Sequence, residues 1–453
     1  MTNEITIDVQ GFKKVLDKVK GCVPSKASIP ILLDVKLDWD KAANMFYLSA
    51  SNGDQYITVE CAERRKTDDG IQVDSCVHML KEEQKGGWVP VCLPYTTLRE
   101  AFSLLPGARR CMVTLQQKDD FTRTMLIDYQ DGKLSLPYEP AEEFPTPPAV
   151  VTADNEAGLR RKQLMADIER LKAEQGEEAQ GMAALRTEFN GIPTPQCRFA
   201  MDAKTLLTAV REARTCCASD ELRPVMEAVA LDCFVDKMIV VASDGHSLYR
   251  CVIDTMGYMQ QVGFPVDQST IILVPKQAMP SLSAFDQTDT ITVSADTQRI
   301  MFEAAGVTLL TRCIEGRYPN YDSVIPKDNP YKVQMSRENL RMALRRINLS
   351  ANSSSNMATM ASDGTSFIVE ASDYDFSREG SERVPVQQTD AFLPEGFKIG
   401  MKISSTLDLI NLLDEDSICL YFSDPGRAFL LKNESPKAQS KTLLQMPMLI
   451  TGE

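Results

Sequence analysis

Histidine is scarce in this chain of 453 residues, which has only His78 and His246, so a histidine-rich metal site or catalytic centre is disfavoured. The chain also lacks an apolar run of about 18 residues, so we expect no membrane-spanning helix. Its first residues, Met1–Glu4, form neither a basic nor an apolar stretch, and we expect no secretory signal. These absences together predict a cytoplasmic protein.

Several catalytic motifs are missing as well. There is no P-loop, no G-x-S-x-G pattern and no H-E-x-x-H pattern. Asp244 with His246 is the remaining candidate for a metal or acid–base site, but no second group of ligands accompanies it. We therefore expect no catalytic residue, no metal site and no cofactor.

Cysteine is present twelve times, but no C-x-x-C pair occurs and the positions are scattered. Cys216 and Cys217 are adjacent, which suits neither a zinc knuckle nor an ordinary disulfide framework. We expect buried, reduced thiols.

The composition, with 43% apolar and 25% charged residues, is that of a globular protein. Asp and Glu number 63 against 49 Lys and Arg, which gives a net charge of -14. This excess argues against broad, non-specific binding of nucleic acid but leaves room for a local basic surface.

A strand-and-turn motif organises the chain. Residues 240–248 read as a buried strand, an Asp-Gly turn and the start of the next strand, because β-branched residues favour strands and glycine favours the turn. Weaker copies occupy residues 46–53 and 367–373. Three copies of one unit predict a threefold internal repeat.

The spacing of other elements supports the repeat. An amphipathic helix precedes each motif, and the interval from its cap is 42, 40 and 35 residues, counted from Asp8, Asp202 and Ser336 to Ala50, Ala242 and Ala371. A second helix and further strands follow each motif; in the second round this helix is expected to open at Pro275. The first round carries about 18 extra residues, which we expect in a polar loop at 64–87 and in later turns.

Residues 149–192 separate the first two rounds and have a helical pattern of their own, with Leu164, Ile168 and Leu171 on one face. One interpretation is a solvated helical hairpin on the linker, which we favour, and the other is a docking arm. The predicted division is 1–148, the insertion 149–192, 193–326 and 327–453.

Three stretches carry a family resemblance: Ala242–Leu248, Ile314–Tyr321 with Val324–Pro326, and Met446–Met448. Ser28–Leu32 and Glu221–Val225 add to it. In this order, the motifs resemble the bacterial DNA polymerase III beta subunit, the sliding clamp. Except for the insertion, the resemblance covers the whole chain.

The resemblance implies an α+β fold of three repeated clamp domains, each with two helices packed on antiparallel sheets. It implies a homodimer that closes a six-domain ring around duplex DNA, in the cytoplasm and associated with the nucleoid. It implies no enzymatic activity. Its partners would be double-stranded DNA without sequence preference, the polymerase III catalytic subunit, the clamp loader and other proteins with clamp-binding peptides, and no membrane.

Basic residues on the first helix of each round, together with two loop residues, are expected to face DNA phosphates. They are Lys14, Lys18, Lys26, Lys204, Arg211, Arg214, Arg223, Arg337, Arg341 and Arg345. For any one of them, an ordinary solvated helix face is the alternative. By resemblance, the dimer interface would include Leu134 and Leu136 of an edge strand and Ile347 and Leu349 of the other subunit.

The resemblance also implies an apolar pocket for partner peptides between the second and third domains. Its residues would be Met226, Ser243, Gly245, His246, Leu248, Pro319, Val324, Met446, Pro447 and Met448. Core packing is the alternative for Leu248 and Val324. The sequence departs from the family at Ser247 and Ser323, where a basic residue is frequent, and by the extension Leu449–Glu453.

Two other classes remain to be separated from the clamp. One is an enzyme centred on Asp244 and His246, and the other is a scaffold protein that binds no nucleic acid. Native mass and retention on circular against linear DNA distinguish all three.

Overall fold

The computed structural model describes residues 3–67, 70–80, 88–105, 109–118, 122–176, 181–220, 222–255, 269–387, 391–435 and 440–450. These residues form two compact units. Unit 1 contains the described residues of 3–207 and 277–313, and unit 2 contains those of 208–276 and 314–450.

Unit 1 is built around two large antiparallel sheets. The five-stranded sheet has the order β11 (Gly132–Pro137), β10 (Arg123–Tyr129), β9 (Arg110–Gln117), β1 (Asn3–Asp8) and β7 (Val77–Met79). The nine-stranded sheet has the order β12 (Glu139–Pro140), β8 (Val91–Pro94), β2 (Asp34–Asp40), β3 (Met45–Ser51), β4 (Gln55–Glu60), β20 (Val307–Arg312), β19 (Arg299–Ala304), β18 (Thr290–Asp296) and β13 (Pro195–Asp202). The pairing of β4 with β20 joins segments about 250 residues apart into one sheet.

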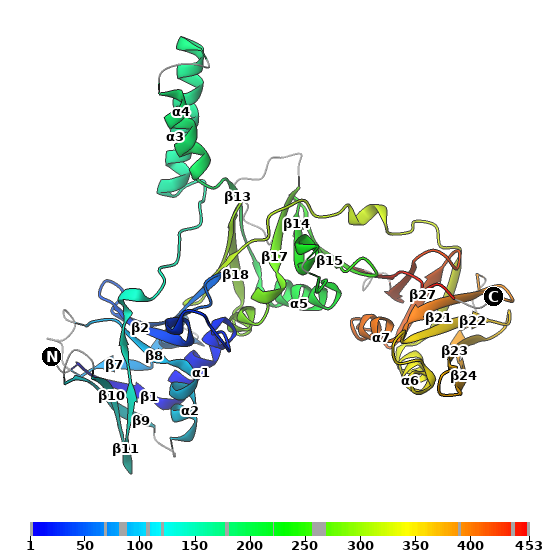
Figure 1. Ribbon diagram of the computed structural model, residues 1–453, viewed down its shortest axis with the longest axis horizontal. Helices are drawn as coiled ribbons and strands as arrows, with labels where there is room; N and C mark the ends of the chain where they lie inside the picture. Colours follow the sequence, from blue (N-terminus) through cyan, green and yellow to red (C-terminus); the bar gives the residue numbers. More distant parts are fainter. Residues whose placement is uncertain are drawn as a thin grey trace. The chain divides into compact units, whose positions relative to one another are not determined.

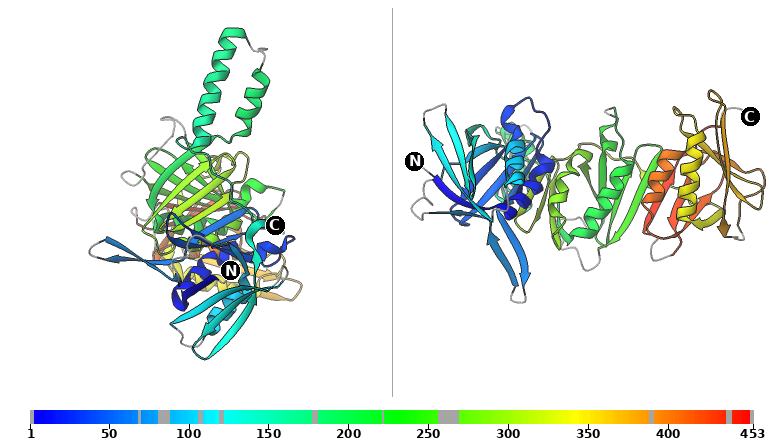
Figure 2. Two further views of the ribbon diagram at one scale, coloured as in Figure 1. Left: turned by 90° about the vertical axis from the view of Figure 1, so that its left-hand side faces the viewer. Right: turned by 90° about the horizontal axis from the view of Figure 1, so that it is seen from below.

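Two helices complete the first part of unit 1, α1 (Val9–Val19) and α2 (Tyr95–Leu104). The apolar stripe of α1 is buried, and Phe12 packs against Phe102 of α2 with ring centroids 4.9 Å apart. A separate two-stranded ribbon, β5 (Ala62–Thr67) with β6 (Gly70–Ser75), stands out from the sheets of this unit (Figure 2).

Helices α3 (Glu156–Gln175) and α4 (Met182–Gly191) form a hairpin that stands away from the sheets of unit 1 (Figure 1). Inside the hairpin, Leu164 is buried and Arg161 lies over the ring of Phe189 at 3.9 Å from its centroid. Just before α3, the Val151 N–H donates to the buried carboxylate of Asp296 at 2.8 Å. The helical pattern predicted for this segment is confirmed.

Unit 2 also contains two large sheets. The nine-stranded sheet has the order β17 (Thr270–Pro275), β14 (Ala228–Cys233), β15 (Lys237–Ser243), β16 (Ser247–Asp254), β29 (Lys441–Gln445), β28 (Phe429–Asn433), β27 (Ser417–Phe422), β21 (Tyr331–Ser336) and β25 (Val386–Gln387). The four-stranded sheet has the order β24 (Arg378–Val384), β23 (Phe367–Asp373), β22 (Met357–Ser362) and β26 (Lys398–Lys402). Both sheets are antiparallel.

Helices α6 (Arg337–Ile347) and α7 (Ile403–Asn411) belong to unit 2, whereas α5 (Ala203–Ala213) crosses the boundary between the units. All three predicted caps are confirmed, because backbone N–H groups donate to Asp8, Asp202 and Ser336 at 2.8, 2.7 and 3.4 Å. The three motif segments form the strands β3, β15 and β23, and each is preceded by one of the capped helices, as the predicted repeat requires.

Two expected elements are wrong. The helix expected to open at Pro275 is replaced by two 3₁₀ turns, Lys276–Ala278 and Ser281–Phe285, because Pro280 between them removes a backbone donor. The polar loop expected at 64–87 contains β6, β7 and most of β5; residues 81–87 lie outside the described part. In β6, the apolar Ile71 and Val73 alternate with the polar Gln72 and Asp74, which suits a strand.

Eleven of the twelve cysteines are buried and Cys313 is half-buried, all as free thiols, as predicted. Burial raises the pKa of Cys22 to about 12, so this thiol stays protonated. None of the helices in the described ranges is long and apolar enough to cross a membrane.

Candidate functional site

The repeated motif of the second round meets the end of the chain in unit 2. Strand β16 pairs with β29 from Ser247 opposite Gln445 to Cys251 opposite Lys441. Just beyond this ladder, the Met446 N–H donates to the His246 carbonyl at 2.7 Å. Two predicted pocket segments nearly 200 residues apart are therefore brought together (Figure 1).

The geometry of the Asp-Gly turn accounts for the residues found at its positions. Gly245 has a φ of +89°, a conformation that glycine adopts without strain. One carboxylate oxygen of Asp244 accepts from the backbone N–H groups of His246 at 2.8 Å and of Ser247 at 2.6 Å. Asp244 thus shapes the turn. Within the described ranges, no cluster of three or more metal-ligating side chains occurs, so the exposed His246 is not part of one.

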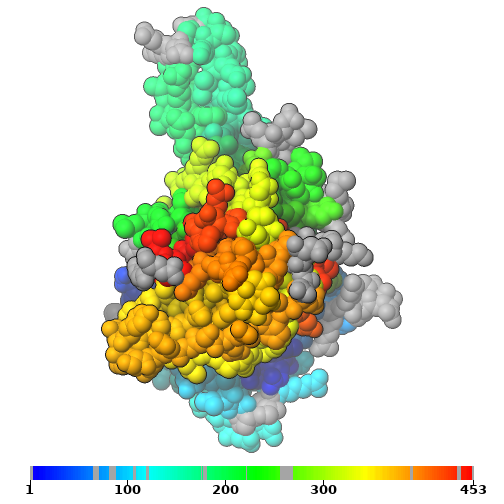
Figure 3. All heavy atoms as spheres, turned by 90° about the vertical axis from the view of Figure 1, so that its right-hand side faces the viewer, coloured from blue at the N-terminus to red at the C-terminus, as the bar shows by residue number. Residues whose placement is uncertain are grey.

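The tail after β29 is held by polar anchors. Gln445 accepts from the Thr406 hydroxyl at 2.6 Å and donates to the Lys402 carbonyl at 3.1 Å. The Met448 N–H donates to the Gly400 carbonyl at 2.9 Å. A side chain at Gly400 would collide with the Met448 carbonyl, so only glycine allows this close approach of the tail. In the space-filling view, the red end of the described chain lies at the molecular surface (Figure 3).

The predicted pocket residues divide into a buried group and a surface group. Leu248 and Met226 are buried, and Leu248 shares one apolar cluster with Tyr318, Tyr321 and Leu444. The surface group comprises exposed and half-buried residues: Ser243, Gly245, His246, Pro319, Val324, Met446, Pro447 and Met448. Leu248 is buried, as core packing requires, whereas Val324 is 52% exposed and is not a core residue.

The predicted DNA-facing residues differ in their burial and in the contacts that they already make within the protein. Lys14 is exposed and forms an ion pair with Glu63 at 2.7 Å. Burial and the neighbouring charge of Arg64 lower the pKa of Lys18. The guanidinium of Arg337 donates to the Leu413 carbonyl at 2.5 Å and so secures the end of α7.

The other basic positions lie at or near the surface. Arg341 forms a two-pronged pair with Glu338, at 2.7 and 2.6 Å, and Arg223 pairs with Asp220 at 3.1 Å. The remaining exposed residues of the set are Lys26, Lys204, Arg211, Arg214 and Arg345. Their exposure leaves their side chains accessible to phosphate groups.

The predicted dimer residues lie on or beside two sheet edges. β11, which carries Leu134 and Leu136, is the edge strand of its sheet in unit 1, and β24 is the edge strand in unit 2. Leu136 is already buried within its own unit, whereas Leu134 is half-buried. Ile347 is buried next to Gly380 of β24, and Leu349 is 74% exposed.

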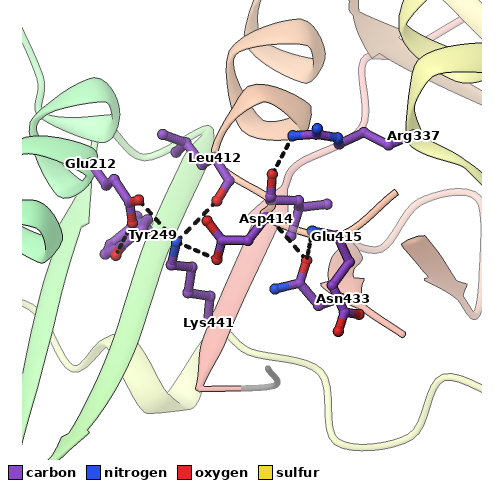
Figure 4. Close-up of polar contacts among 9 residues, drawn as sticks. Glu212, Tyr249, Arg337, Leu412, Asp414, Glu415, Asn433 and Lys441 are labelled. Atoms are coloured by element: carbon purple, nitrogen blue, oxygen red, sulfur yellow. Dashed lines mark hydrogen bonds and ion pairs between the residues drawn. The ribbon is translucent and has the colours of Figure 1, made fainter. Parts of the chain in front are cut away.

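A partly buried ionic cluster that sequence reasoning missed lies beside the β16–β29 ladder (Figure 4). The Lys441 ammonium donates to Glu212 at 2.9 Å, to Asp414 at 2.7 Å and to the Leu412 carbonyl at 3.3 Å. Tyr249 donates to the other oxygen of Glu212 at 2.7 Å. Burial lowers the pKa of Lys441, but its hydrogen bonds to Asp414 and Glu212 outweigh burial and leave that pKa raised.

Comparison with known proteins identifies the fold and the family. Residues 200–320 match the central domain of the DNA polymerase III beta subunit, and residues 322–448 match its C-terminal domain. The beta sliding clamp of Streptococcus pneumoniae is 21% identical over 424 residues, covering 93% of this chain and 92% of the relative. That of Bacillus subtilis is 22% identical over 267 residues, covering 58% and 67%.

Solved structures show the same fold. The sliding clamp structure from Bacillus subtilis superposes with a TM-score of 0.75 at 16% identity, covering 99% of this chain and 100% of that one. The C. crescentus clamp gives 0.74 at 19% identity and covers 99% of both chains.

The chain therefore has the fold of the sliding clamps, a class of replication proteins that are not enzymes. Because the two domain matches span more than half of its length, it belongs to the DNA polymerase III beta subunit family.

Proposed function

We propose that two copies of this chain close a ring around duplex DNA and tether the replicative polymerase, as a processivity factor. Membership of the beta-clamp family supports this function directly. The ring, the DNA-facing surface and the peptide pocket are the specific parts of the proposal. With these parts, the protein would act on DNA in the cytoplasm and bind the polymerase, the clamp loader and similar partners.

The proposal of a ring rests on a strand pairing between repeats that occurs twice within the chain. The strand that follows the motif pairs with a later hairpin strand twice within the chain, as β4 with β20 and as β16 with β29. The third pair of equivalent strands, β24 and β11, are edge strands of their sheets. A second copy of the chain would pair β24 of one subunit with β11 of the other, and so remove both edges.

The repeat also sets the register of this intersubunit pairing. In the first junction, Ile57 lies opposite both Ala50 of the motif and Leu309, the third residue of β20. The corresponding residues are Gly380, which lies opposite Ala371, and Leu134, the third residue of β11. We therefore place Leu134 of one subunit opposite Gly380 of the other.

This register suits the side chains on both faces. A Cβ at Gly380 would stand 2.9 Å from the Ser350 hydroxyl and 3.3 Å from the terminal methyl of Ile347, so the incoming Leu134 would find an apolar neighbour in Ile347. On the other face, Lys133 would lie opposite Ser381, close to the carboxylate of Glu370 that Ser381 contacts at 3.2 Å. Opposite charges would thus meet across the junction.

The first helices of the three repeats support contact with DNA. Each has a buried apolar stripe and basic side chains outside it, in a chain whose net charge is -14. Basic residues confined to the surface that meets DNA would contact phosphates without reading bases. The ring would then stay on DNA by enclosure and would slide.

The peptide pocket is proposed at the β16–β29 junction. Buried Leu248 and Met226 would form its floor, and the exposed Val324 and Met446 part of its rim. Methionine and proline surfaces anchored by backbone hydrogen bonds suit ligands of varied apolar shape. The proposed domains are 1–148, 193–326 and 327–453, with 149–192 as an insertion.

Two measurements test the ring. Native mass should give a dimer, and the protein loaded on DNA should stay on closed circles but leave linear DNA. A monomer that binds neither form would contradict the clamp and favour a scaffold protein. Leu134→Asp should give monomers, and a variant that remains a stable dimer would refute the proposed edge.

Cysteine cross-linking tests the register. Ser135→Cys combined with Glu379→Cys places two thiols directly opposite each other in the proposed ladder, within disulfide reach. The control, Ser135→Cys with Ser381→Cys, is displaced by two residues. Efficient cross-linking of the control but not of the first pair would show that the register is wrong.

A further inference from the structure

A hollow lies on the outer face of the sheet in the first repeat, within unit 1. Its volume is about 660 Å³. Its walls come from β2, β3 and β4 and from the segment 144–147 that crosses them, and include Asp38, Tyr47, Tyr56, Phe144 and Pro147. We call it the first-repeat hollow; none of the predicted site residues lines it.

The internal repeat identifies the matching place in the second repeat. Motif residues Ala50 and Ala242 are equivalent, and from them each position of the β2–β3 ladder can be assigned a counterpart in the β14–β15 ladder. Tyr47 and Ile239 each lie three positions before their motif alanine. Asp38 lies opposite Tyr47 as Asp232 lies opposite Ile239, so the two carboxylates are equivalent.

In the second repeat this place is filled by the chain itself. Tyr321 is buried in an apolar cluster with Ile239, Val241 and Leu248. Its hydroxyl donates to Asp232 at 2.6 Å. Burial, and then this hydrogen bond, raise the pKa of Tyr321, so the phenol remains a donor.

The first repeat has no counterpart of Tyr321, the side chain that fills this place in the second repeat. The crossing segments align as Phe144-Pro145-Thr146-Pro147 and Tyr318-Pro319-Asn320-Tyr321, which puts Pro147 where Tyr321 stands. A proline ring is too small and has no hydroxyl to reach Asp38. Asp38 instead forms an ion pair with Lys36 at 3.0 Å, and a third of its side chain is exposed.

We propose that the first-repeat hollow binds an extended peptide segment of a partner protein that inserts a tyrosine ring and donates its hydroxyl to Asp38. The second repeat shows the fit, because the same sheet face there accepts a tyrosine from a proline-containing extended segment. The aromatic walls Tyr47, Tyr56 and Phe144 would cover the ring. This site is separate from the pocket at the β16–β29 junction and depends on neither the ring nor DNA.

A labelled peptide that copies residues 318–323 is a suitable probe, with binding to the full chain followed by fluorescence anisotropy. A second peptide has phenylalanine in place of the residue corresponding to Tyr321. The tyrosine peptide should bind in a saturable way, and Asp38→Ala should weaken it about tenfold, as expected for a hydrogen bond to a carboxylate. The phenylalanine peptide should bind as weakly to the unaltered chain and be insensitive to Asp38→Ala.

Two further variants locate the site. Pro147→Tyr should fill the hollow from within and abolish binding, whereas Met448→Ala at the other pocket should leave it unchanged. The inference is overturned if neither peptide binds, if Asp38→Ala weakens both peptides equally, or if Pro147→Tyr binds as well as the unaltered chain. Loss of binding in Met448→Ala alone would also overturn it, by assigning the peptide to the junction pocket.

Discussion

Lys441 of β29 donates a hydrogen bond of 2.9 Å to Glu212 of α5, although 229 residues separate them in sequence. The lysine side chain is only 11% exposed, and Asp414 accepts a second hydrogen bond from it. The cost of removing the two charges from water offsets much of their attraction, but removing one partner alone leaves the other charge without compensation. It ties the second repeat to the third beside the ladder that ends in the peptide-pocket segments.

Removing the lysine should therefore be costly. Lys441→Ala leaves the largely buried Glu212 without its cation, whereas Asp414 is 61% exposed and stays hydrated, and we expect a loss of about 2 kcal/mol in the free energy of unfolding. Denaturant titration measures it. The control, Arg170→Ala on α3, removes an exposed pair with Asp167 and should cost less than about 1 kcal/mol. Equal, small effects in both variants would show that the cluster does not stabilise the fold.

Asp34 should make stability depend on pH. Burial, and then the nearby charge of Glu139, raise the pKa of Asp34 to about 6, above the value of about 4 in an unfolded chain. Stability linked to its proton is thus present below about pH 4 and is lost as the pH rises through about 6. Asp34→Asn, which resembles the protonated form, should remove this part of the decline in denaturant midpoint. Glu142→Gln is the control, and an unchanged pH profile in Asp34→Asn would contradict the assignment.

Local features of the fold could be predicted from the sequence, because they depend on short-range patterns. A run of β-branched apolar residues before the Asp-Gly turn identified β15, and the caps Asp8 and Asp202 marked helix starts correctly. The apolar periodicity at 275–285 indicated a helix, but Pro280 divides it into 3₁₀ turns. The Lys441 cluster had no signal at all, since its partners meet only after the chain has folded.

Two arginines of α6 should contribute differently to DNA binding: Arg345 is exposed, whereas Arg337 already donates a hydrogen bond within the protein. Arg345→Ala should weaken binding to a short duplex and lower the slope of log affinity against log salt by about one unit for each phosphate that the variant no longer neutralises. Arg337→Ala should instead reduce stability, because its guanidinium holds the Leu413 carbonyl. Anisotropy titrations at several salt concentrations, with thermal unfolding alongside, separate the two. A salt slope unchanged in Arg345→Ala would remove this residue from the DNA surface.

The tail segment should govern binding of a polymerase-tail peptide. Met448→Ala removes a half-buried side chain but keeps the backbone bond to Gly400, so the tail should stay in place while peptide affinity falls at least tenfold. Truncation after Gln445 should abolish binding and leave the dimer intact. Leu449→Ala, at a position that is 90% exposed, is the control for calorimetry. Full affinity in both Met448→Ala and the truncated chain would rule out this pocket.

The helical hairpin should be dispensable for the fold, whereas its attachment should not. Only a few apolar side chains, such as Leu164 and Met182, are buried in α3 and α4. At the base, buried Asp296 accepts from the backbone N–H groups of Val151, Gln298 and Arg299, each at 2.8 Å. A deletion of residues 156–191 that keeps Val151 should therefore change stability by less than about 1 kcal/mol, or about 2–4 °C in Tm.

Asp296→Ala is the matched contrast for that deletion, because it leaves three backbone donors unsatisfied and should cost clearly more. Calorimetric unfolding of both variants, with native mass to follow the dimer, measures the difference. If deletion of the hairpin destabilises the protein more than Asp296→Ala does, the hairpin is part of the folded core. If the deletion leaves fold and dimer intact but impairs replication in cells, the docking-arm interpretation gains over that of a solvated linker.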